Sequence, residues 1–254
     1  MQSESQPGSG GDPLPTGADT MSPAMRDMQA YPRYLFRCVQ RYLGDRVWEI
    51  GVGYGTYTAM LREIDRQVLA TDIDPACLDA VRNRFVDDDA VRAEIVDLTD
   101  EASVRAIADF RADSIVCFNV LEHIEDDIAA LRWMKDAVAP HAMLALIVPA
   151  HQWLFGKMDS EAGHFRRYSR RRAAEALRAA GWIVHRTRYL NMTGAAGWWY
   201  HNRCRNDAGL ADDSVNRQMR SADRWLPRLA RVTDPLFGFI TGLSVMAIGK
   251  ARPD

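Results

Sequence analysis

The feature that most constrains this chain is a short apolar run that ends in three closely spaced glycines. The run 47–50 leads into Gly51, Gly53 and Gly55, and a second apolar run ends in Asp72. Short apolar runs are typical of buried strands, and glycine lets the backbone turn tightly and come close to a ligand. In open α/β sheets, ligands bind at the carboxyl ends of parallel strands. The sequence therefore predicts a nucleoside-binding crevice, where the Asp72 carboxylate would accept hydrogen bonds from ribose hydroxyls.

Two nucleoside cofactors compete for this crevice. The dinucleotide fingerprint needs a third glycine for close packing of helix on strand, and Thr56 stands at that position. Glu49 precedes the first glycine, and a carboxylate there suits an ammonium group better than a pyrophosphate. S-adenosylmethionine (SAM) carries an ammonium and no phosphate, so the residues favour SAM over NAD. A glycine turn without a ligand is disfavoured, because three glycines weaken a junction that has no ligand to approach.

The pattern E-x-G-x-G-x-G that starts at Glu49 resembles motif I of the class I SAM-dependent methyltransferases. Residues 92–98 are similar to the third strand of that family with its acidic end, and residues 114–124 resemble its motif IV. The resemblance covers residues 31–251. It implies an α/β, Rossmann-like fold with a seven-stranded sheet and helices on both faces. It also implies methyl transfer from SAM, with S-adenosylhomocysteine (SAH) as the product.

The same resemblance implies which residues contact the cofactor. Glu49 would orient the methionine ammonium indirectly, and Asp72 would bind the ribose. Asp97 and Leu98 would contact the adenine, and Asn119 the methionine end. The full set expected to bind the cofactor is Tyr34, Glu49, Gly51, Gly53, Tyr54, Gly55, Thr56, Asp72, Ile73, Asp97, Leu98, Asn119 and Val120.

Apolar runs and helical patterns alternate along the chain, which predicts a parallel sheet with crossover helices. The strands are expected near residues 46–50, 67–72, 92–96, 114–119, 142–148, 182–185 and 243–248. The resemblance implies that the last strand runs antiparallel beside the sixth. Helices are expected near residues 55–64, 126–138 and 170–180, and another opens at Pro75.

The beginning of the chain falls into two parts. Residues 1–20 are rich in Gly, Pro, Ser and acidic side chains, which predicts a disordered tail before a methyltransferase domain over 21–254. Apolar residues at helical spacing predict a helix near 23–44. This helix either packs on the sheet or covers SAM, with Tyr31 or Tyr34 at the methionine end.

Two connections, 149–169 and 189–242, are too long for the simple alternation. Long connections inside a compact domain are usually functional, so we expect them to recognise the substrate, the second as a helical cap between the last two strands. Residues 159–169 read D-x-x-x-G-H-x-R-R-Y-S, which resembles a bacterial subgroup of small-molecule methyltransferases. Within the second connection, residues 221–239 predict an amphipathic helix broken at Pro235, acting as a lid or as packing.

His164 is the first candidate for a catalytic residue. Methyl transfer is an in-line displacement that depends mainly on positioning, and a histidine base helps when the acceptor is a hydroxyl that must lose a proton. The alternative is that His164 braces its loop by a hydrogen bond to Asp159. His123 follows the fourth strand near the expected sulfonium and is the second catalytic candidate.

Several residues of the long connections are candidates for binding the substrate. Arg166 and Arg167 could clamp a carboxylate or phosphate of the acceptor, or they could pair with Asp159 or Glu161. Tyr168 lines the pocket or starts the next helix. Tryptophans of the second connection could form an aromatic wall, pack in the core, or face a second copy or a membrane surface. The expected substrate-binding set is Trp153, Arg166, Arg167, Tyr168, Asn191, Trp198 and Trp199.

Composition and motifs exclude several other functions. The formal charge of −2 gives no bulk attraction for nucleic acid, and residues 119–122 do not match the [DNS]-P-P-[YF] pattern of enzymes that methylate base nitrogens. The cysteines have no C-x-x-C spacing, which predicts no metal site and reduced thiols in a cytoplasmic protein. No run is long and apolar enough to form a transmembrane segment.

The sequence therefore predicts an enzyme that transfers a methyl group from SAM to a small-molecule acceptor and acts as a monomer or homodimer. An oxygen acceptor is the first choice, because a histidine would then have a proton to remove. Nitrogen, carbon and protein acceptors remain open. A non-catalytic SAM-binding module and an NAD-dependent oxidoreductase are the alternatives of a different class.

Overall fold

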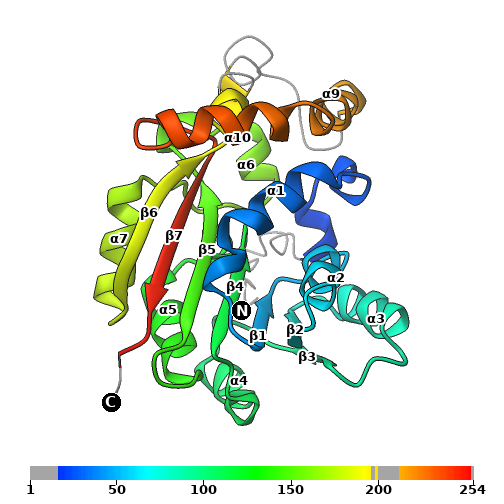
Figure 1. Cartoon of the computed structure of the whole chain (residues 1–254), viewed down its shortest axis with the longest axis vertical. Coiled ribbons are helices and arrows are strands. Elements are labelled where there is room, and N and C mark those ends of the chain that lie inside the picture. The colour runs from blue at the N-terminus through cyan, green and yellow to red at the C-terminus, as the bar shows by residue number, and fades with distance from the viewer. Residues whose placement is uncertain (1–16, 196–197, 200–211, 253–254) are drawn as a thin grey trace, which may run out of the picture.

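The centre of the fold is a seven-stranded sheet with the order β3-β2-β1-β4-β5-β7-β6 (Figure 1). The computed structural model describes residues 17–195, 198–199 and 212–252. All neighbouring strands are parallel except β7, which runs antiparallel to both β5 and β6. The strands are β1 (Arg46–Ile50), β2 (Gln67–Asp72), β3 (Val91–Ile95), β4 (Ser114–Phe118), β5 (Met143–Pro149), β6 (Ile183–Leu190) and β7 (Ser244–Lys250). This topology confirms the predicted class I methyltransferase sheet.

Helices cover both faces of the sheet, as predicted (Figure 1). Side chains along a strand point alternately to opposite faces, so Trp48 and Val47 enter two different apolar clusters, one with Leu131 and Leu177 and the other with Leu61. The described α-helices are α1 (Ala30–Val39), α2 (Thr56–Arg62), α3 (Pro75–Arg84), α4 (Glu101–Arg105), α5 (Asp127–Asp136), α6 (Lys157–Glu161), α7 (Arg170–Ala179), α9 (Asp213–Asp223) and α10 (Leu226–Phe237).

The helix expected over 23–44 is broken into three pieces. These are the 3-10 turn η2 (Pro23–Arg26), α1 and the 3-10 turn η3 (Gln40–Tyr42). The carboxylate of Asp223 in α9 accepts hydrogen bonds from the backbone N–H groups of Gln29, Ala30 and Tyr31. A carboxylate at this place satisfies the free N–H groups of a helix start, so a residue distant in the sequence fixes where α1 begins.

Residues 1–20 were expected to form a disordered tail, but the last four of them, Gly17–Thr20, form the 3-10 turn η1. Residues 1–16 lie outside the described part of the chain. Other 3-10 turns are η4 (Ala108–Phe110), η5 (Leu121–His123) and η6 (Gln152–Leu154).

The cap between the last two strands contains α9 and α10, and α10 crosses the end of β6 and β7 (Figure 1). The expected break at Pro235 is wrong, because α10 runs through this residue to Phe237. A proline in the last turn removes one backbone hydrogen bond close to the helix end, which is less costly than a break in the middle. The chain breaks instead between α9 and α10. Among the described helices, none is long and apolar enough to cross a membrane.

Candidate active site

The glycine turn after β1 has the backbone conformation that the sequence predicted. Gly51, Gly53 and Gly55 have φ values of 72°, 49° and 68°, a region that L-residues with a side chain rarely adopt. A Cβ atom at Gly51 would collide with the side chain of Val120 in the loop after β4. The first glycine is therefore required both by its conformation and by the close approach of a second loop.

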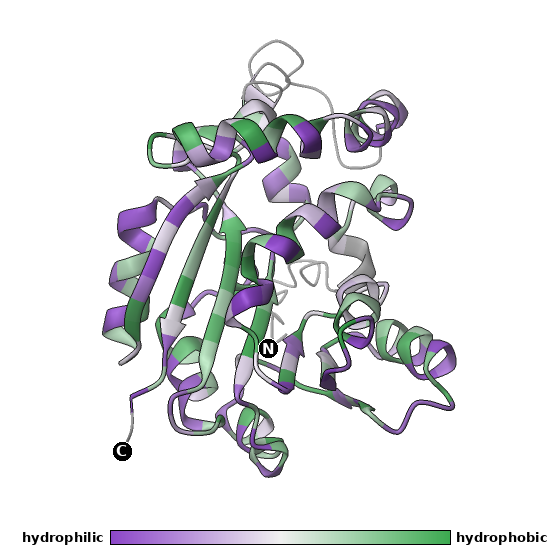
Figure 2. Ribbon diagram, in the orientation of Figure 1, coloured by the Kyte–Doolittle hydropathy of each residue, from purple (hydrophilic) through white to green (hydrophobic). Residues whose placement is uncertain are grey.

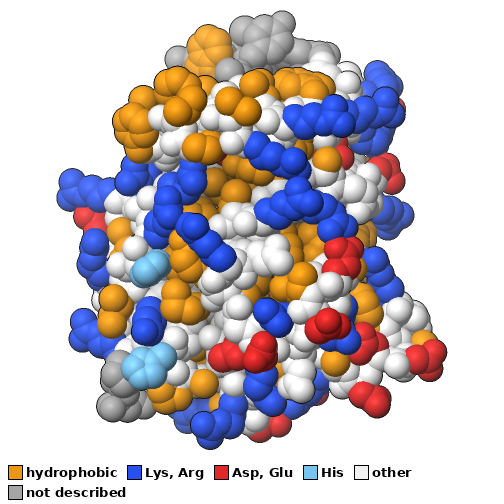
Figure 3. All heavy atoms as spheres, viewed as in Figure 1, with side chains coloured by type: hydrophobic (Ala, Val, Ile, Leu, Met, Phe, Trp, Pro, Cys, Tyr) orange, Lys and Arg blue, Asp and Glu red, His pale blue; other side chains and the backbone are white. Residues whose placement is uncertain are grey.

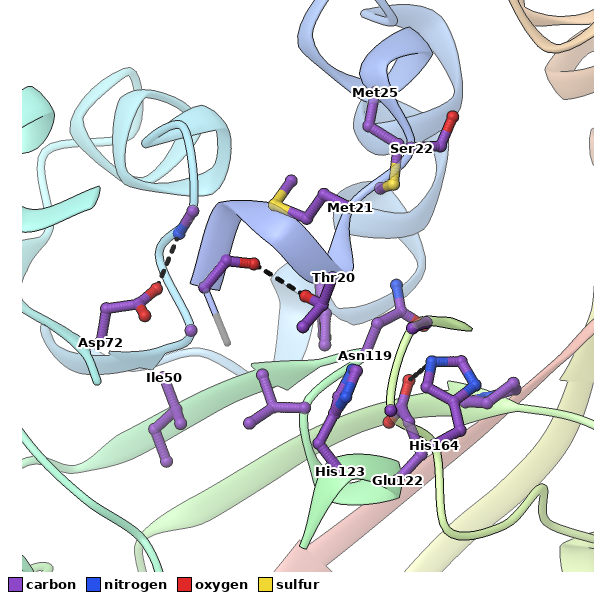
Figure 4. A pocket seen from close by; sticks show the side chains of 18 of the residues that line it. Thr20, Met21, Ser22, Met25, Ile50, Asp72, Asn119, Glu122, His123 and His164 are labelled. Carbon is purple, nitrogen blue, oxygen red and sulfur yellow. Dashed lines mark hydrogen bonds and ion pairs between the residues drawn. The ribbon is translucent and has the colours of Figure 1, made fainter. Parts of the chain in front are cut away.

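A cavity of about 470 Å³ lies at the carboxyl ends of β1, β2 and β4, beside this turn. Figure 4 shows Asp72 at one side of the pocket and Glu122, His123 and His164 at the other. Ten of the residues expected to bind the cofactor line the cavity: Gly51, Gly53, Tyr54, Thr56, Asp72, Ile73, Asp97, Leu98, Asn119 and Val120. Gly55 instead caps the start of α2 in the left-handed conformation.

Asp72 ends β2 with its carboxylate held by the backbone. One oxygen accepts a hydrogen bond of 3.1 Å from the Gly53 N–H, and the other accepts one of 3.0 Å from the Asp74 N–H. Burial raises the pKa of this carboxyl above its usual value, and the two N–H donors act in the opposite direction. These contacts fix the carboxylate at the cavity wall, where an acceptor for ribose hydroxyls was expected.

Glu49 lies beneath the glycine turn and does not line the cavity. Its Oε2 accepts a hydrogen bond of 2.6 Å from the Thr58 hydroxyl, while Oε1 is buried with no hydrogen-bond partner among the described residues. Burial raises the pKa of this carboxyl to about 8. A buried oxygen with spare capacity beneath the turn fits the indirect role towards an ammonium group. Together with the cradle that only glycine allows at residue 51, the residues present fit SAM.

Tyr34 is placed away from the cavity, contrary to its expected role at the cofactor. Its hydroxyl donates a hydrogen bond to Asp234 of α10, and the side chain is buried. The same carboxylate accepts from the backbone N–H groups of Asn191 and Met192, so it ties α1 and the cap together. Tyr31, the alternative that the sequence left open, lines the cavity.

His164 and His123 both line the cavity and lie together, across the pocket from Asp72 (Figure 4). The Nδ1 atom of His164 lies 2.8 Å from Oδ1 of Asp159, and its Nε2 lies 4.0 Å from Oε1 of Glu122. The two imidazole rings pack edge to face with centroids 4.6 Å apart. The Asp159 contact fits a brace for the loop, and because it occupies only Nδ1, it is also compatible with Nε2 as a proton acceptor, which stays a prediction.

Glu122 was not among the predicted site residues, yet its carboxylate is central to this cluster. Both carboxylate oxygens are buried and lack a hydrogen-bond partner among the described residues. Burial raises the pKa of Glu122 to about 7, an effect that the neighbouring His164 opposes. Burial lowers the pKa of His123 to about 4, and the nearby His164 lowers it further. His123 is therefore neutral at neutral pH, whereas Glu122 binds a proton readily.

Arg167 adds a positive charge to the cluster of Glu122, His123, Asp159 and His164. Its Nε donates to Oδ1 of Asp159 at 2.7 Å and a terminal nitrogen donates to the Ala150 carbonyl at 3.2 Å. Burial would raise the pKa of Asp159, but the hydrogen bond from His164 and the charge of Arg167 outweigh it and hold that pKa below its usual value. The guanidinium also lies over the Trp198 ring, 5.0 Å from its centroid. Arg167 and Trp198 both line the cavity.

Glu122, His123 and His164 offer ligand atoms within 4.8 Å of one another, so they could hold a divalent cation. The sequence predicted no metal site because its cysteines lack the spacing of zinc ligands. A cluster drawn from two separate loops gives no such spacing. The Arg167 guanidinium already supplies a fixed positive charge to the same group of side chains.

Arg166 and Tyr168, two residues of the expected substrate-binding set, turn away from the cavity. Arg166 pairs with Asp127 of α5 at 3.2 Å and donates to the Glu125 carbonyl. Tyr168 is fully buried, and its hydroxyl donates to the same Asp127 carboxylate at 2.8 Å. Because adjacent side chains in an extended segment point to opposite sides, Arg167 faces the cavity while its two neighbours pack on α5.

The remaining expected substrate contacts also fall outside the cavity lining. Trp153 is 63% exposed and packs against the His151 ring. Trp199 is 48% exposed. Asn191 is buried, and its side-chain oxygen accepts a hydrogen bond from the Gly194 N–H. These three residues are corrected to surface or structural roles.

Five methionines that the sequence did not point to line the cavity. Met21 and Met25 reach in from the N-terminal segment (Figure 4), which also supplies Met28, while Met158 comes from α6 and Met219 from α9. Methionine fills irregular space and adapts to different partners, but an isolated methionine carries no recognisable motif. The lining methionines are Met21, Met25, Met28, Met158 and Met219.

Comparisons with solved structures agree with this architecture. The chain is similar to a putative methyltransferase–Trm112 activator complex from Haloferax volcanii (17% identity, TM-score 0.57, covering 91% of this chain and 92% of that chain). It is similar to a putative sarcosine dimethylglycine methyltransferase from Galdieria sulphuraria (12% identity, TM-score 0.57, covering 88% of this chain and 85% of that chain). It also resembles phosphoethanolamine N-methyltransferase 2 from Haemonchus contortus, determined with SAM (14% identity, TM-score 0.57, covering 87% of this chain and 53% of that chain). At these identities the likeness shows the fold alone.

A search of curated proteins finds no match to this chain. A family model described as "Methyltransferase domain" matches residues 26–187. The match runs from before β1 into the first half of β6 and contains the glycine turn, the acidic end of β2, and both histidines of the cluster. The chain therefore belongs to this methyltransferase family and is an enzyme that transfers a methyl group from SAM.

Proposed function

We propose that the acceptor is a hydroxyl group of an apolar small molecule and that His164 removes its proton. The observation that carries the proposal is the pairing of His164 Nδ1 with Asp159 in a residue that lines the cavity, which leaves Nε2, 4.0 Å from the Glu122 carboxylate, as the nitrogen that can accept a proton. A carboxylate that accepts the Nδ1 proton fixes the tautomer in which Nε2 can accept another. The apolar wall of methionines and aromatic rings favours an apolar acceptor.

The charges of the cluster suit a group that takes up one proton. Burial raises the pKa of Glu122 to about 7. Above this pH Glu122 and Asp159 are both negative and Arg167 is positive, so a neutral His164 leaves one negative charge in excess. A proton on His164 would bring the cluster to neutrality. The Glu122 carboxylate, 4.0 Å from Nε2, would then stabilise the imidazolium without receiving the proton itself.

In the proposed mechanism SAM supplies a methyl group bound to a positively charged sulfur. The chain's own residues do the rest: the glycine turn and Asp72 hold the cofactor, and the opposite wall places the acceptor in line with the methyl group. His164 Nε2 accepts the hydroxyl proton as the oxygen becomes nucleophilic. Met21, Met25 and Tyr31 would exclude water from the cavity.

Turnover with matched acceptors tests the acceptor atom. Purified protein with SAM is offered phenols and long-chain alcohols, and in parallel the amines and thiols of the same skeleton. We expect SAH formation, and a product heavier by one methylene, only with the hydroxyl compounds. Methylation of the amines alone would contradict the oxygen assignment and leave the methyl transfer itself intact.

The cofactor side of the site gives a separate prediction. Asp72→Asn is expected to weaken SAH binding about 10- to 100-fold, because a hydrogen bond to a charged group contributes about 1.5–3 kcal/mol. Titration calorimetry measures the affinity, with NAD run in parallel and expected not to bind. Asp79→Asn on the exposed face of α3 is the matched control and should bind SAH as the unaltered chain does. Equal affinity in both variants would mean that Asp72 does not contact the nucleoside.

The charge of Glu122 should also appear in the pH dependence. Burial raises the pKa of Glu122 to about 7, so its carboxyl loses a proton as pH rises through this range, and kcat should rise with it because the carboxylate stabilises the protonated base. In Glu122→Gln no carboxyl titrates at this position. This acid limb of the kcat profile should therefore disappear, and the maximal rate should fall. A profile that keeps the limb would contradict the assignment of Glu122.

A further inference from the structure

Helix α10 presents an unpartnered apolar face to solvent. Trp225, Leu229, Val232 and Leu236 recur at helical spacing along one side, and Phe239 and Ile240 continue the stripe beyond the helix end. Val232 is 64% exposed, Leu236 59% and Phe239 66%. Figure 3 shows hydrophobic side chains gathered over α10 at the top of the view. We call these six residues the α10 apolar face.

The opposite side of α10 is held firmly against the fold. Pro227, Ala230 and Asp234 are buried. Asp234 accepts from the Tyr34 hydroxyl and from the cap backbone, and its carbonyl accepts a hydrogen bond of 2.6 Å from Arg188. The helix is therefore fixed in its orientation, and the apolar face is directed outward by the packing of its other side.

Within α10 and the turn after it, the exposed charged residues beside this face are all positive. Arg224, Arg228 and Arg231 are exposed and precede Trp225, Leu229 and Val232 by one position each, so they form a rim along one edge of the stripe. The only acidic residue between Arg224 and Ile240 is Asp234, which is buried. Exposed apolar patches of this kind mark interaction sites, and an arginine rim long enough to reach past the apolar edge suits an anionic surface.

We propose that the α10 apolar face docks the enzyme on an anionic lipid bilayer. A helix with large apolar side chains on one face and arginines beside it is the pattern of helices that lie in the membrane interface, and anionic lipid attracts such basic segments. Pairing of the same face between two copies is disfavoured, because a two-fold interface would bring the arginines of both copies together with no exposed acid between them.

The docking surface adjoins the acceptor side of the cavity. After Phe239 and Ile240, the chain passes through only two residues before it reaches Leu243 and Ser244, which line the cavity. Met219 of the neighbouring α9 lines it as well. A bilayer on α10 would therefore lie close to an apolar, methionine-lined pocket. Only this last step, that the membrane supplies the acceptor, rests on the proposed function; the docking itself does not.

Vesicle co-sedimentation tests the docking. The full chain is mixed with vesicles of phosphatidylcholine alone or of phosphatidylcholine with phosphatidylglycerol. We expect binding to the anionic vesicles, weakened by salt, and little binding to phosphatidylcholine. Val232→Asp and Leu236→Asp should each weaken binding about tenfold or more, because each removes one large apolar side chain from the contact. Arg228→Glu combined with Arg231→Glu should abolish the preference for anionic lipid.

Matched controls separate docking from misfolding. Val86→Asp and Ile95→Asp replace exposed apolar residues far from α10 and should bind vesicles as the unaltered chain does. SAH binding, measured on every variant, reports the folded site. Absence of vesicle binding by the unaltered chain, or equal binding by the α10 variants, overturns the proposal. A dimer in sedimentation analysis that Val232→Asp dissociates would also overturn it and assign the face to a second copy.

Discussion

His164→Ala is expected to lower kcat by about 10²- to 10⁴-fold, the usual contribution of a positioned general base, while SAH binds with nearly unchanged affinity. The side chain lines the cavity, with Nδ1 held by Asp159 and Nε2 4.0 Å from the Glu122 carboxylate. Removing it leaves the glycine turn and Asp72 in place, so the cofactor side is not altered. Single-turnover measurement of SAH formation, beside titration of SAH, separates the two effects.

Three outcomes would contradict this role for His164. An unchanged kcat would make the residue a brace for its loop, the alternative that the Asp159 contact also supports. Loss of activity on chelation of metals would instead indicate that Glu122, His123 and His164 hold a cation, since their ligand atoms lie within 4.8 Å of one another. An equal loss in His185→Ala, a histidine on the exposed edge of β6, would show that the defect is not specific to the cavity.

The sequence predicts the sheet well because its central strands are short apolar runs buried on both faces. β6 is the exception: the pattern predicts 182–185, whereas the strand extends over Ile183–Leu190. As an edge strand with the polar residues His185, Arg186 and Arg188, it carries little apolar signal, and a bulge between Val184 and Arg186 interrupts its alternation. Figure 2 shows the contrast between hydrophilic β6 and the more hydrophobic β5.

The start of α1 could not be predicted, because no local residue determines it. The chain near Gln29 has no side chain that caps the helix, and Asp223 supplies the acceptor from α9. A contact between residues this far apart leaves no mark in the local pattern. The same holds for Tyr34. Its position in the helix suits a residue that covers the cofactor, but its hydroxyl donates a hydrogen bond to Asp234 of α10 instead.

The two halves of the site differ in how far the sequence predicts them. The cofactor half is built from consecutive residues at strand ends, so the motif and the geometry coincide at Gly51, Asp72 and Asn119. The acceptor half is assembled from the N-terminal segment, the loop after β5 and the cap, which the alternation of strands and helices does not bring together. Glu122 directly precedes the predicted residue His123, but only the structure shows its importance, because its buried carboxylate oxygens have no hydrogen-bond partner among the described residues.

The second large effect is expected in stability. Arg167→Leu should lower the free energy of unfolding by about 3–5 kcal/mol at pH 7, because it leaves a buried carboxylate without its charge partner. Both side chains are almost fully buried, and Nε of Arg167 lies 2.7 Å from Oδ1 of Asp159. The Ala150 carbonyl loses a donor as well. Urea denaturation measures the difference, with Arg171→Leu as the control, because the exposed pair of Arg171 with Glu175 is screened by solvent and should contribute little to stability.

The sign of the pH dependence distinguishes an unpaired charge from a simple loss of packing. In the unaltered chain the pKa of Asp159 is lowered, so the pair stabilises the fold above the pKa of the unfolded carboxyl, about 3.9, and this contribution disappears as pH falls through the lower folded value. In Arg167→Leu, burial without the guanidinium favours the protonated carboxyl, so the variant recovers stability relative to the unaltered chain as pH falls from 7 towards 4. A deficit that is constant over this range would assign the loss to packing, and a deficit no larger than that of Arg171→Leu would mean that the new leucine compensates for the pair.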